Sequence, residues 1–358
     1  MLYDYLVVGH GLAGAILTRT LQQSGKSVFV FDTEKPNSAS NVAAGLINPV
    51  AGKRFAKSWQ ADVFIPAAKA FYRELEAELQ TPLFHQLPIL KLFSSIEEQN
   101  NWMGKSAGAP VNEYIAAVHT TLPFSETVHQ ELGGLEIAQG GFVEMKKMLH
   151  LLREKLLNQR LLRSGQLDFS KLSISEEGVQ YEAIQARHLV FCEGYQAIYN
   201  PYFKWLPFSP NKGEVLDLEV KNFNPKRIYN KGVYVVPIGE NCWKVGATYN
   251  WRQPDEIPTE EGRAELLQKA GQVLKLPLTV TGHLAGIRPA VRDRKPLIGT
   301  HPELPNVSIF NGMGSKGVMM APYLARHFAD VLAGGTVLEK EVAISRYHSF
   351  YLEREKNI

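Results

Sequence analysis

The sequence predicts an α/β fold, in which a βαβ unit at the N-terminus belongs to one domain and a mostly antiparallel sheet belongs to another. Two short apolar runs flank an amphipathic helix pattern within about 30 residues, which is typical of a βαβ unit. Later, β-prone runs alternate with glycine, asparagine and proline, which is typical of an antiparallel sheet. With 358 residues, 45% of them hydrophobic, the chain can bury two cores.

The βαβ unit is predicted from three consecutive patterns. Residues 3–8 are a β-prone apolar run, residues 13–23 have helical periodicity, and residues 28–31 form a second apolar run. Gly25 is expected to end the helix, because glycine readily takes the left-handed conformation that follows a helix. The two strands are therefore expected to be parallel, with a right-handed crossover between them.

The rest of the chain contains further helices and a run of strands. Helices are expected where apolar residues recur every three or four positions, at residues 65–80, 145–156, 259–274 and 317–332. Strands are expected at residues 213–220, 232–237 and 243–249. Because no flexible linker separates these stretches, the second domain is expected to be inserted into the first. The first domain is predicted to comprise 1–80, 137–204 and 284–358, and the second 81–136 and 205–283.

A glycine-rich turn joins the first strand to the first helix. Residues 9–14 read Gly-His-Gly-Leu-Ala-Gly, and Asp32 ends the second strand 18 residues after Gly14. Gly9 permits the tight turn, Gly11 lets the backbone approach a pyrophosphate, and Gly14 lets the helix lie close to the sheet. The helix N-terminus attracts phosphate, and Asp32 can accept both ribose hydroxyls. The sequence thus predicts a Rossmann-like dinucleotide site with contacts from Gly9, Gly11, Leu12, Ala13, Gly14, Asp32 and Thr33.

A second glycine-rich segment, residues 312–317, precedes the last long helix. Such a loop brings backbone amides close to a flat ring at a helix N-terminus. Together with the β-rich insertion, it favours FAD over NAD; an ordinary turn is the alternative. The expected contacts are Gly312, Met313, Gly314, Ser315, Lys316 and Gly317.

Composition limits the partners and the compartment. The formal net charge is +3, from 39 Lys plus Arg and 36 Asp plus Glu, so no nucleic-acid partner is expected. Two cysteines exclude a disulfide framework, no metal-ligand spacing occurs, and no apolar run is long enough to span a membrane. We expect a cytoplasmic protein; its oligomeric state is left open.

From residue 3 to about residue 335, the chain resembles the D-amino-acid oxidase family of FAD-dependent enzymes. Besides the N-terminal turn, the resemblance rests on residues 40–46, on residues 192–194, and on residues 286–289 followed by Asp293. It implies a discontinuous FAD-binding domain and an α+β substrate domain. FAD is expected to be non-covalent, because no cysteine lies in the C-terminal flavin segment. The further FAD contacts that the resemblance implies are Ser40, Ala43, Ala44, Gly45, Leu46, Leu172, Cys192, Glu193, Gly194 and Arg288.

The resemblance also implies a substrate side. Arg288, in Gly-Ile-Arg-Pro, is expected to bind a substrate carboxylate through its planar fork. The alternative is a structural ion pair with a residue such as Asp293. Tyr234 and Tyr249 are expected to cover the flavin ring or to be core. Lys316 is expected to stabilise negative charge on the reduced ring, or else to point into solvent.

The sequence analysis therefore predicts an FAD-dependent oxidoreductase that oxidises a small amino acid or secondary amine to an imine, with hydride transfer to flavin N5. A 2-hydroxy-acid dehydrogenase and a tRNA-modifying amine oxidase are the alternatives within enzymes. A subunit that binds FAD only for assembly or electron relay is the alternative outside catalysis. Lys53 and Arg54 are expected either to line the pocket or to be solvated.

Overall fold

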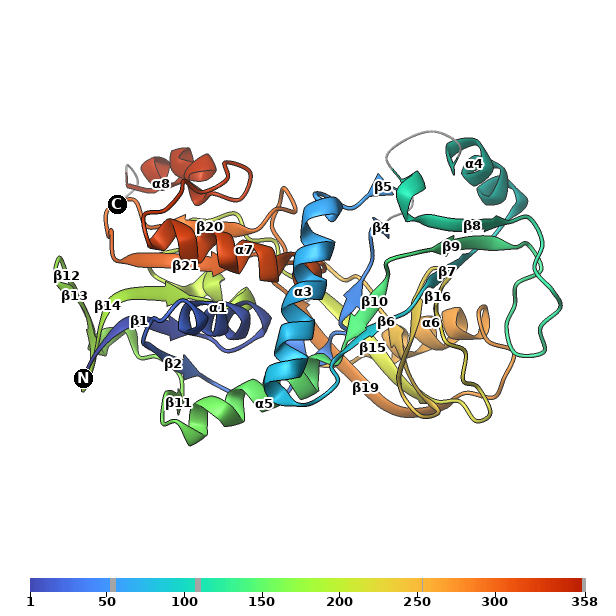
Figure 1. The fold of residues 1–358 in the computed structure, drawn as a ribbon, viewed down its shortest axis with the longest axis horizontal. Helices are drawn as coiled ribbons and strands as arrows, with labels where there is room; N and C mark the ends of the chain where they lie inside the picture. The colour runs from blue at the N-terminus through green and yellow to red at the C-terminus, as the bar shows by residue number, and fades with distance from the viewer. Residues whose placement is uncertain (52–55, 107–110, 253, 356–358) are drawn as a thin grey trace. The chain divides into compact units, whose positions relative to one another are not determined.

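The computed structural model describes residues 1–51, 56–106, 111–252 and 254–355 (Figure 1). The chain divides into two compact units that are interleaved along the sequence. The first comprises Met1–Asn41, Lys146–Asn211 and Ile287–Ile358, and the second comprises Val42–Met145 and Lys212–Gly286.

These boundaries differ from the predicted ones at residues 42–80, 137–145 and 284–286, which the sequence analysis places in the first domain, and at residues 205–211, which it places in the second. The reason is local pairing. Strand β3 (Leu46–Ile47) pairs with β10 (Gly141–Val143), and helix α3 (Ala61–Leu79) packs on β6 (Phe84–Gln86). All four elements belong to the second unit.

The first unit is built on a largely parallel sheet. Its main path runs β11-β2-β1-β14-β13-β12, with β21 beside β14 and β20 beside β21. Because β11, β2, β1, β14 and β21 are parallel, their carboxyl ends meet at one edge. The strands are β1 (Leu2–Val8), β2 (Val28–Asp32), β11 (Leu162–Ser164), β12 (Leu172–Ser175), β13 (Gly178–Tyr181), β14 (Ile184–Phe191), β20 (Leu297–Thr300) and β21 (Val307–Asn311).

The helices of this unit follow the predicted patterns. Helix α1 (Leu12–Gln23) connects β1 and β2, which are parallel, so the predicted βαβ unit is present. Gly25 takes a φ of 76° directly after the helix end, as a chain-reversing residue should. Helix α1 lies beside α7 (Gly317–Leu332) (Figure 1). The others are α2 (Ala39–Val42), α5 (Met145–Asn158) and α8 (His348–Glu355), with short 3-10 turns at Phe169–Lys171, Gly194–Tyr199 and Ile344–Tyr347.

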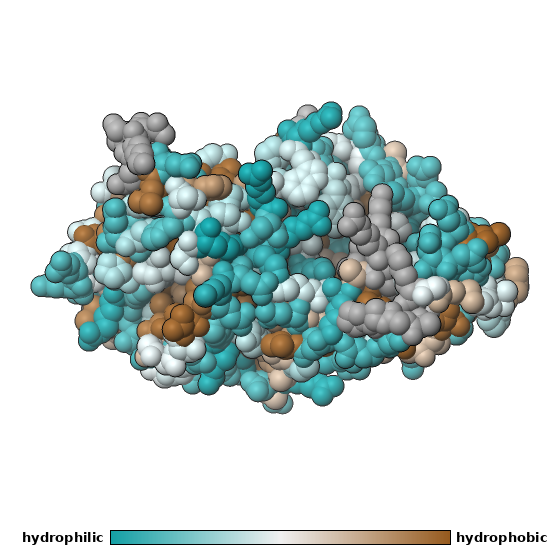
Figure 2. Space-filling view, turned by 90° about the horizontal axis from the view of Figure 1, so that it is seen from above, coloured by the Kyte–Doolittle hydropathy of each residue, from teal (hydrophilic) through white to brown (hydrophobic). Residues whose placement is uncertain are grey.

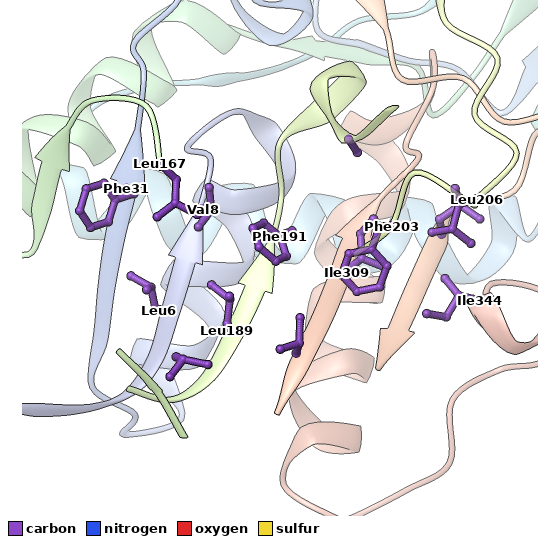
Figure 3. Packing of buried hydrophobic residues seen from close by; sticks show 14 of the residues in the cluster. Leu6, Val8, Phe31, Leu167, Leu189, Phe191, Phe203, Leu206, Ile309 and Ile344 are labelled. Atoms are coloured by element: carbon purple, nitrogen blue, oxygen red, sulfur yellow. The ribbon is translucent and has the colours of Figure 1, made fainter. Parts of the chain in front are cut away.

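An apolar core on this sheet holds the strand edge in place. Phe31, Val8 and Phe191, the last or next-to-last residues of β2, β1 and β14, are buried together (Figure 3). Leu206 and Ile344 continue the cluster from outside these strands. The burial of such side chains contributes roughly 1.5–3 kcal/mol each. The loops that follow the strands therefore start from rigid positions.

The second unit contains a mixed sheet of order β19-β15-β18-β17-β16-β7-β9-β8. The predicted antiparallel pairing is confirmed for β15, β18 and β17, whereas β16 and β7 are parallel. The strands are β7 (Ile89–Leu92), β8 (Ile115–His119), β9 (Gly134–Ile137), β15 (Asn211–Glu219), β16 (Ile228–Asn230), β17 (Tyr234–Gly239), β18 (Cys242–Gly246) and β19 (Thr279–Arg288). The strand expected at residues 243–249 corresponds to β18, which ends at Gly246.

Smaller elements complete the second unit. Helix α6 (Glu260–Gly271) starts after Thr259, whose hydroxyl accepts a hydrogen bond from the Gly262 N–H, which is an N-cap contact. Helix α4 (Ile96–Ser106) and the two-stranded sheet of β4 (Val50–Ala51) and β5 (Ala56–Lys57) complete the described elements, with a 3-10 turn at Asn112–Tyr114.

The helices and one face of the surface were compared with what a membrane-spanning protein requires. None of the helices in the described parts of the chain combines the length and the apolar composition needed to cross a membrane. On the face shown in Figure 2, hydrophilic side chains predominate and apolar ones lie in small separate groups. Scattered apolar groups of this kind are ordinary on a protein surface.

Candidate functional site

The turn between β1 and α1 shows why three glycines are needed. A Cβ on Gly9 would lie 2.5 Å from the Cys192 carbonyl oxygen, and one on Gly14 would lie 1.9 Å from the Gly9 oxygen. Both glycines are therefore required by packing of the chain itself. A Cβ on Gly11 would meet only the Ser40 side chain, with Oγ at 3.2 Å. Gly11 thus leaves space over the N-terminus of α1, which is where a pyrophosphate binds in this motif.

Asp32, at the end of β2, is already engaged by three donors of the protein. Its Oδ1 accepts from the His10 N–H at 2.8 Å, and its Oδ2 accepts from the Glu34 N–H at 3.0 Å. The guanidinium of Arg153 also reaches Oδ2, with Nη1 at 2.6 Å. A carboxylate has about four acceptor positions, so about one remains. By this count about one acceptor position of Asp32 is left for a ribose hydroxyl, and the expected contact with both hydroxyls stays a prediction.

The end of β14 lies next to this turn. Cys192 is buried, its N–H donates to the Val8 oxygen at 2.7 Å, and burial raises the pKa of its thiol well above the usual range. The next residue, Glu193, accepts a hydrogen bond at Oε2 from Asn200 Nδ2 at 2.6 Å. Burial raises the pKa of Glu193 to about 7. This strand end therefore carries a carboxyl group that is largely uncharged below neutral pH.

The C-terminal glycine loop follows β21 at the same edge of the sheet. Asn311 links it to the β14 loop, because its Nδ2 donates to the Gly194 oxygen at 2.9 Å. Gly312 and Gly314 have φ values of 74° and 54°, a region that favours glycine. The loop leads into α7 at Lys316.

Lys316 is half-buried, so the expectation of a fully solvent-directed lysine does not describe it. Burial lowers the pKa of its ammonium, and the nearby positive charge of Arg294 lowers this pKa further. A half-buried cation acts on its surroundings with less screening than an exposed one.

Arg288 lies at the last position of β19 and is half-buried. Its Nη1 donates to Asn211 Oδ1 at 2.6 Å. Asp293, the expected alternative partner, is bound instead by Arg346, with Nε and Oδ2 2.9 Å apart. The hydrogen bond to Asn211 orients the guanidinium without cancelling its charge, because an amide is neutral.

Comparison with known proteins agrees with this geometry. The family model for FAD-dependent oxidoreductases of the DAO type matches residues 4–331. The chain belongs to the DAO family. It is therefore an FAD-dependent oxidoreductase, and FAD is its cofactor.

Three members of the DAO family, or of similar structure, illustrate its range. The chain is 27% identical to a glycine oxidase of Bacillus licheniformis, over 94% of each chain. It is 23% identical to the tRNA 5-methylaminomethyl-2-thiouridine biosynthesis bifunctional protein MnmC of Marinobacter nauticus, over 91% of this chain and 54% of that protein. The glycine oxidase structure from Geobacillus kaustophilus has a TM-score of 0.77 and 21% identity, and covers 94% of this chain and 96% of that chain. This last likeness shows the DAO fold.

The residues around the first turn of α1 leave room for the diphosphate of a dinucleotide such as FAD. Gly11 leaves the space over α1, and the Ser40 hydroxyl, which accepts from the Leu12 N–H at 2.9 Å, lies at its border. Ala13 and Gly14 are buried in the first turn of α1, while Thr33, directly after Asp32, is exposed. Their contacts with FAD stay a prediction.

Other predicted contacts belong to the second unit. Ala43, Ala44, Gly45 and Leu46 lead into β3. Gly45 has a packing role of its own, because a Cβ there would lie 1.9 Å from the Val143 oxygen. The close approach of β10 therefore explains why residue 45 is a glycine, whether or not FAD contacts the loop.

Tyr234 and Tyr249, also in the second unit, differ in their surroundings. The Tyr234 hydroxyl accepts from Asn48 Nδ2 at 2.8 Å, and burial raises the pKa of Tyr234 to about 12. Tyr249 is 64% exposed, so it is not core, which was one of its two predicted roles. Tyr234 therefore keeps its proton at neutral pH and can donate it.

Leu172 packs near the end of β2, although β12 and β2 are far apart in the strand order. It pairs with Tyr181 of β13, whose ring centroid lies 4.8 Å from that of Phe31, the residue before Asp32. The Gly165 N–H, directly after β11, donates to the backbone oxygen of Asp32 at 2.9 Å. The adenosine contact expected at Leu172 stays a prediction.

Two functional candidates were missed at the sequence level, Asn211 and Arg153. Their partners are 77 and 121 residues away, so no local motif includes them. Lys53 and Arg54 lie outside the described residues. Within those residues, no three histidine, cysteine or acidic side chains come together as metal ligands would.

Proposed function

We propose that this protein oxidises a small amino acid, or a secondary amine that carries a carboxylate, to the corresponding imine. The observation that carries the proposal is Arg288, a half-buried guanidinium that the neutral amide of Asn211 holds in place at the end of β19. Arginine matches the planar geometry of a carboxylate and can bind it through two hydrogen bonds. The likeness to glycine oxidases supports an amine as the group that is oxidised.

The chemistry divides between cofactor and protein. Bound FAD supplies the acceptor for a hydride from the substrate α-carbon. Arg288 binds and orients the carboxylate, and the amine nitrogen loses a proton to solvent as the carbon–nitrogen double bond forms. Water then adds to the imine and releases the amine, leaving a carbonyl product. Tyr234, held by Asn48, is proposed as a hydroxyl donor on the substrate side.

We propose that FAD is held without a covalent bond. Of the two cysteines, Cys192 is buried at the end of β14 and Cys242 begins β18 in the second unit. Neither belongs to the segment 312–317 that is expected to lie along the flavin. Acid should therefore release intact FAD from the protein. The free cysteines are also compatible with a reducing, cytoplasmic location, which we propose.

The deciding experiment is an anaerobic substrate panel on the purified yellow protein. Glycine, sarcosine, proline and D-amino acids are compared with lactate, malate and 2-hydroxyglutarate, and loss of the flavin absorbance near its visible maximum is followed. Bleaching by an amine supports the proposal and identifies the side chain that the pocket accepts. Bleaching by a hydroxy acid while all amines leave the flavin oxidised would replace amine oxidation by 2-hydroxy-acid dehydrogenation.

A second candidate is oxidation of a carboxymethylated amine on a tRNA base. The match to the tRNA-modifying protein of Marinobacter nauticus favours it, since that match covers 91% of this chain. The balanced charge of +3 argues for a small substrate instead. Adding tRNA that carries the modified uridine to the same anaerobic assay separates the two, because only the tRNA candidate predicts bleaching by tRNA.

A further inference from the structure

The partner of Arg288 is itself an unusual group. Asn211 opens β15, is 1% exposed, and faces Arg288 at the end of the neighbouring strand β19. Because the guanidinium has only donors, the amide oxygen of Asn211 must be the atom that faces it. The amide nitrogen, Nδ2, is therefore directed away from Nη1.

Among the described residues, Nδ2 of Asn211 is buried and has no hydrogen-bond acceptor. A buried N–H without an acceptor is unfavourable, and native proteins rarely keep one without a reason. The hydrogen bond to Arg288 accounts for the oxygen of this amide but not for its nitrogen. An acceptor that arrives with a ligand would satisfy this N–H.

The chemistry of that acceptor follows from its neighbour. Oδ1 and Nδ2 share one carbon, so an oxygen atom that accepts from Nδ2 comes close to the guanidinium that Oδ1 holds. A ligand group with two oxygens and a negative charge satisfies both residues at once, and a carboxylate has this shape. A neutral ligand oxygen would accept from the amide but would bring no negative charge to the guanidinium.

We propose that Asn211 belongs to the carboxylate-binding site together with Arg288. Its Oδ1 positions the guanidinium, and its Nδ2–H donates to an oxygen of the bound carboxylate. The inference rests on the proposed function, in which Arg288 binds the substrate carboxylate, and it adds a residue that decides between anionic and neutral ligands.

The test uses the FAD-loaded protein and two unreactive probes of one shape, propionate and propionamide. Their dissociation constants are measured from the change in the flavin absorption spectrum. Asn211→Leu should weaken propionate binding about tenfold by removing both amide contacts. Asn211→Asp should weaken it about a hundredfold, because the new carboxylate cancels the charge of Arg288 and repels the probe. Propionamide, whose oxygen accepts from Nδ2 without a negative charge, should be weakened less than propionate in both variants.

A matched control is Asn306→Leu, since Asn306 lies in the same unit and its Nδ2 donates to the Ser175 oxygen on the surface. This variant should bind propionate as the wild type does. Asn211→Asp keeps an oxygen for Arg288 and hence its main structural contact. If Asn211→Leu fails to retain FAD, the aspartate variant alone decides, and unchanged propionate affinity overturns the inference.

The outcomes separate the two proposals. Propionate binding that is lost in Arg288→Ala but unchanged in both Asn211 variants overturns the role of Asn211 and leaves the role of Arg288 intact. Equal weakening of propionate and propionamide in the Asn211 variants shows a merely structural residue and also overturns the inference. Wild-type protein that does not distinguish propionate from propionamide contradicts the carboxylate site itself.

Discussion

Arg153 and Asp32 form an ion pair at the carboxyl end of β2, with Nη1 and Oδ2 2.6 Å apart. The Arg153 side chain is 7% exposed and also donates from Nη2 to Ser164 Oγ at 2.7 Å. The acidic residue that closes the dinucleotide motif is thus held by a helix residue from far along the chain. Arg153 therefore fixes the orientation of the Asp32 carboxylate before any nucleotide binds.

This ion pair predicts a separation of FAD binding from folding stability. Asp32→Ala removes the remaining ribose acceptor, and FAD affinity should fall about 10–100-fold, as expected for one charge-assisted hydrogen bond. Arg153→Met leaves that acceptor in place and should cost much less affinity. Both variants should unfold at lower temperature, because each removes one member of a largely buried ion pair.

The dissociation constant of FAD is measured by quenching of its fluorescence on titration into apoprotein. An Asp32→Ala protein that binds FAD as tightly as the wild type would contradict the assignment of Asp32 to the ribose. If Arg153→Met loses as much FAD affinity as Asp32→Ala, Asp32 binds FAD only when it is paired with Arg153.

Arg288→Ala should raise the KM for a carboxylate-bearing amine about tenfold to several hundredfold, since a charge-assisted contact to the substrate is lost. FAD affinity should be unchanged. Steady-state kinetics give the first quantity and fluorescence quenching gives the second. Arg288→Lys keeps the charge without the planar fork and should lie between the wild type and the alanine variant. If the wild type, Arg288→Ala and Arg288→Lys have the same KM, Arg288 does not bind the substrate.

Lys316→Met should make the flavin harder to reduce. Reduction places negative charge on the ring, and a half-buried ammonium at the start of α7 would stabilise that charge. Each 1.4 kcal/mol of lost stabilisation lowers a two-electron potential by about 30 mV. The potential is measured by equilibration with a reference dye, with the exposed Lys204→Met as control. Equal potentials for Lys316→Met and wild type would assign any such effect to the helix N-terminus alone.

Glu193 predicts a pH dependence of stability with a defined sign. Its pKa in the folded protein is raised to about 7, so between about pH 4.5 and 7 the folded state binds more protons than the unfolded state. Its contribution to stability therefore falls as the pH rises through this window. Glu193→Gln cannot ionise and should gain stability relative to wild type at pH 8, on the order of 2–3 kcal/mol, but not at pH 4.5.

Urea unfolding at the two pH values measures this difference. Glu177→Gln serves as control, because Glu177 is exposed in the turn between β12 and β13 and its replacement should have no pH-dependent effect. A Glu193→Gln protein whose stability runs parallel to wild type from pH 4.5 to 8 would show that Glu193 ionises normally.

Local patterns were sufficient for the elements that are expected to bind the nucleotide. The strand, glycine turn, helix and acidic end of residues 2–32 lie within one continuous segment, and α7 begins at Gly317 and ends at Leu332 as predicted. Such elements are readable because hydrophobic periodicity and glycine conformation act over a few residues. Patterns of this kind do not reveal which strand becomes the neighbour of β1, so they did not show that β14, from the middle of the chain, lies beside it.

By itself, the sequence determined the mixed α/β class, the dinucleotide turn, the family and hence FAD, since these depend on residue types at short, regular spacing. Only the tertiary structure decided which side chains meet across the chain. It paired Arg288 with Asn211, 77 residues apart, and Asp32 with Arg153, 121 residues apart. Hydrogen bonds depend on distances of a few ångströms, and packing of the whole sheet sets those distances.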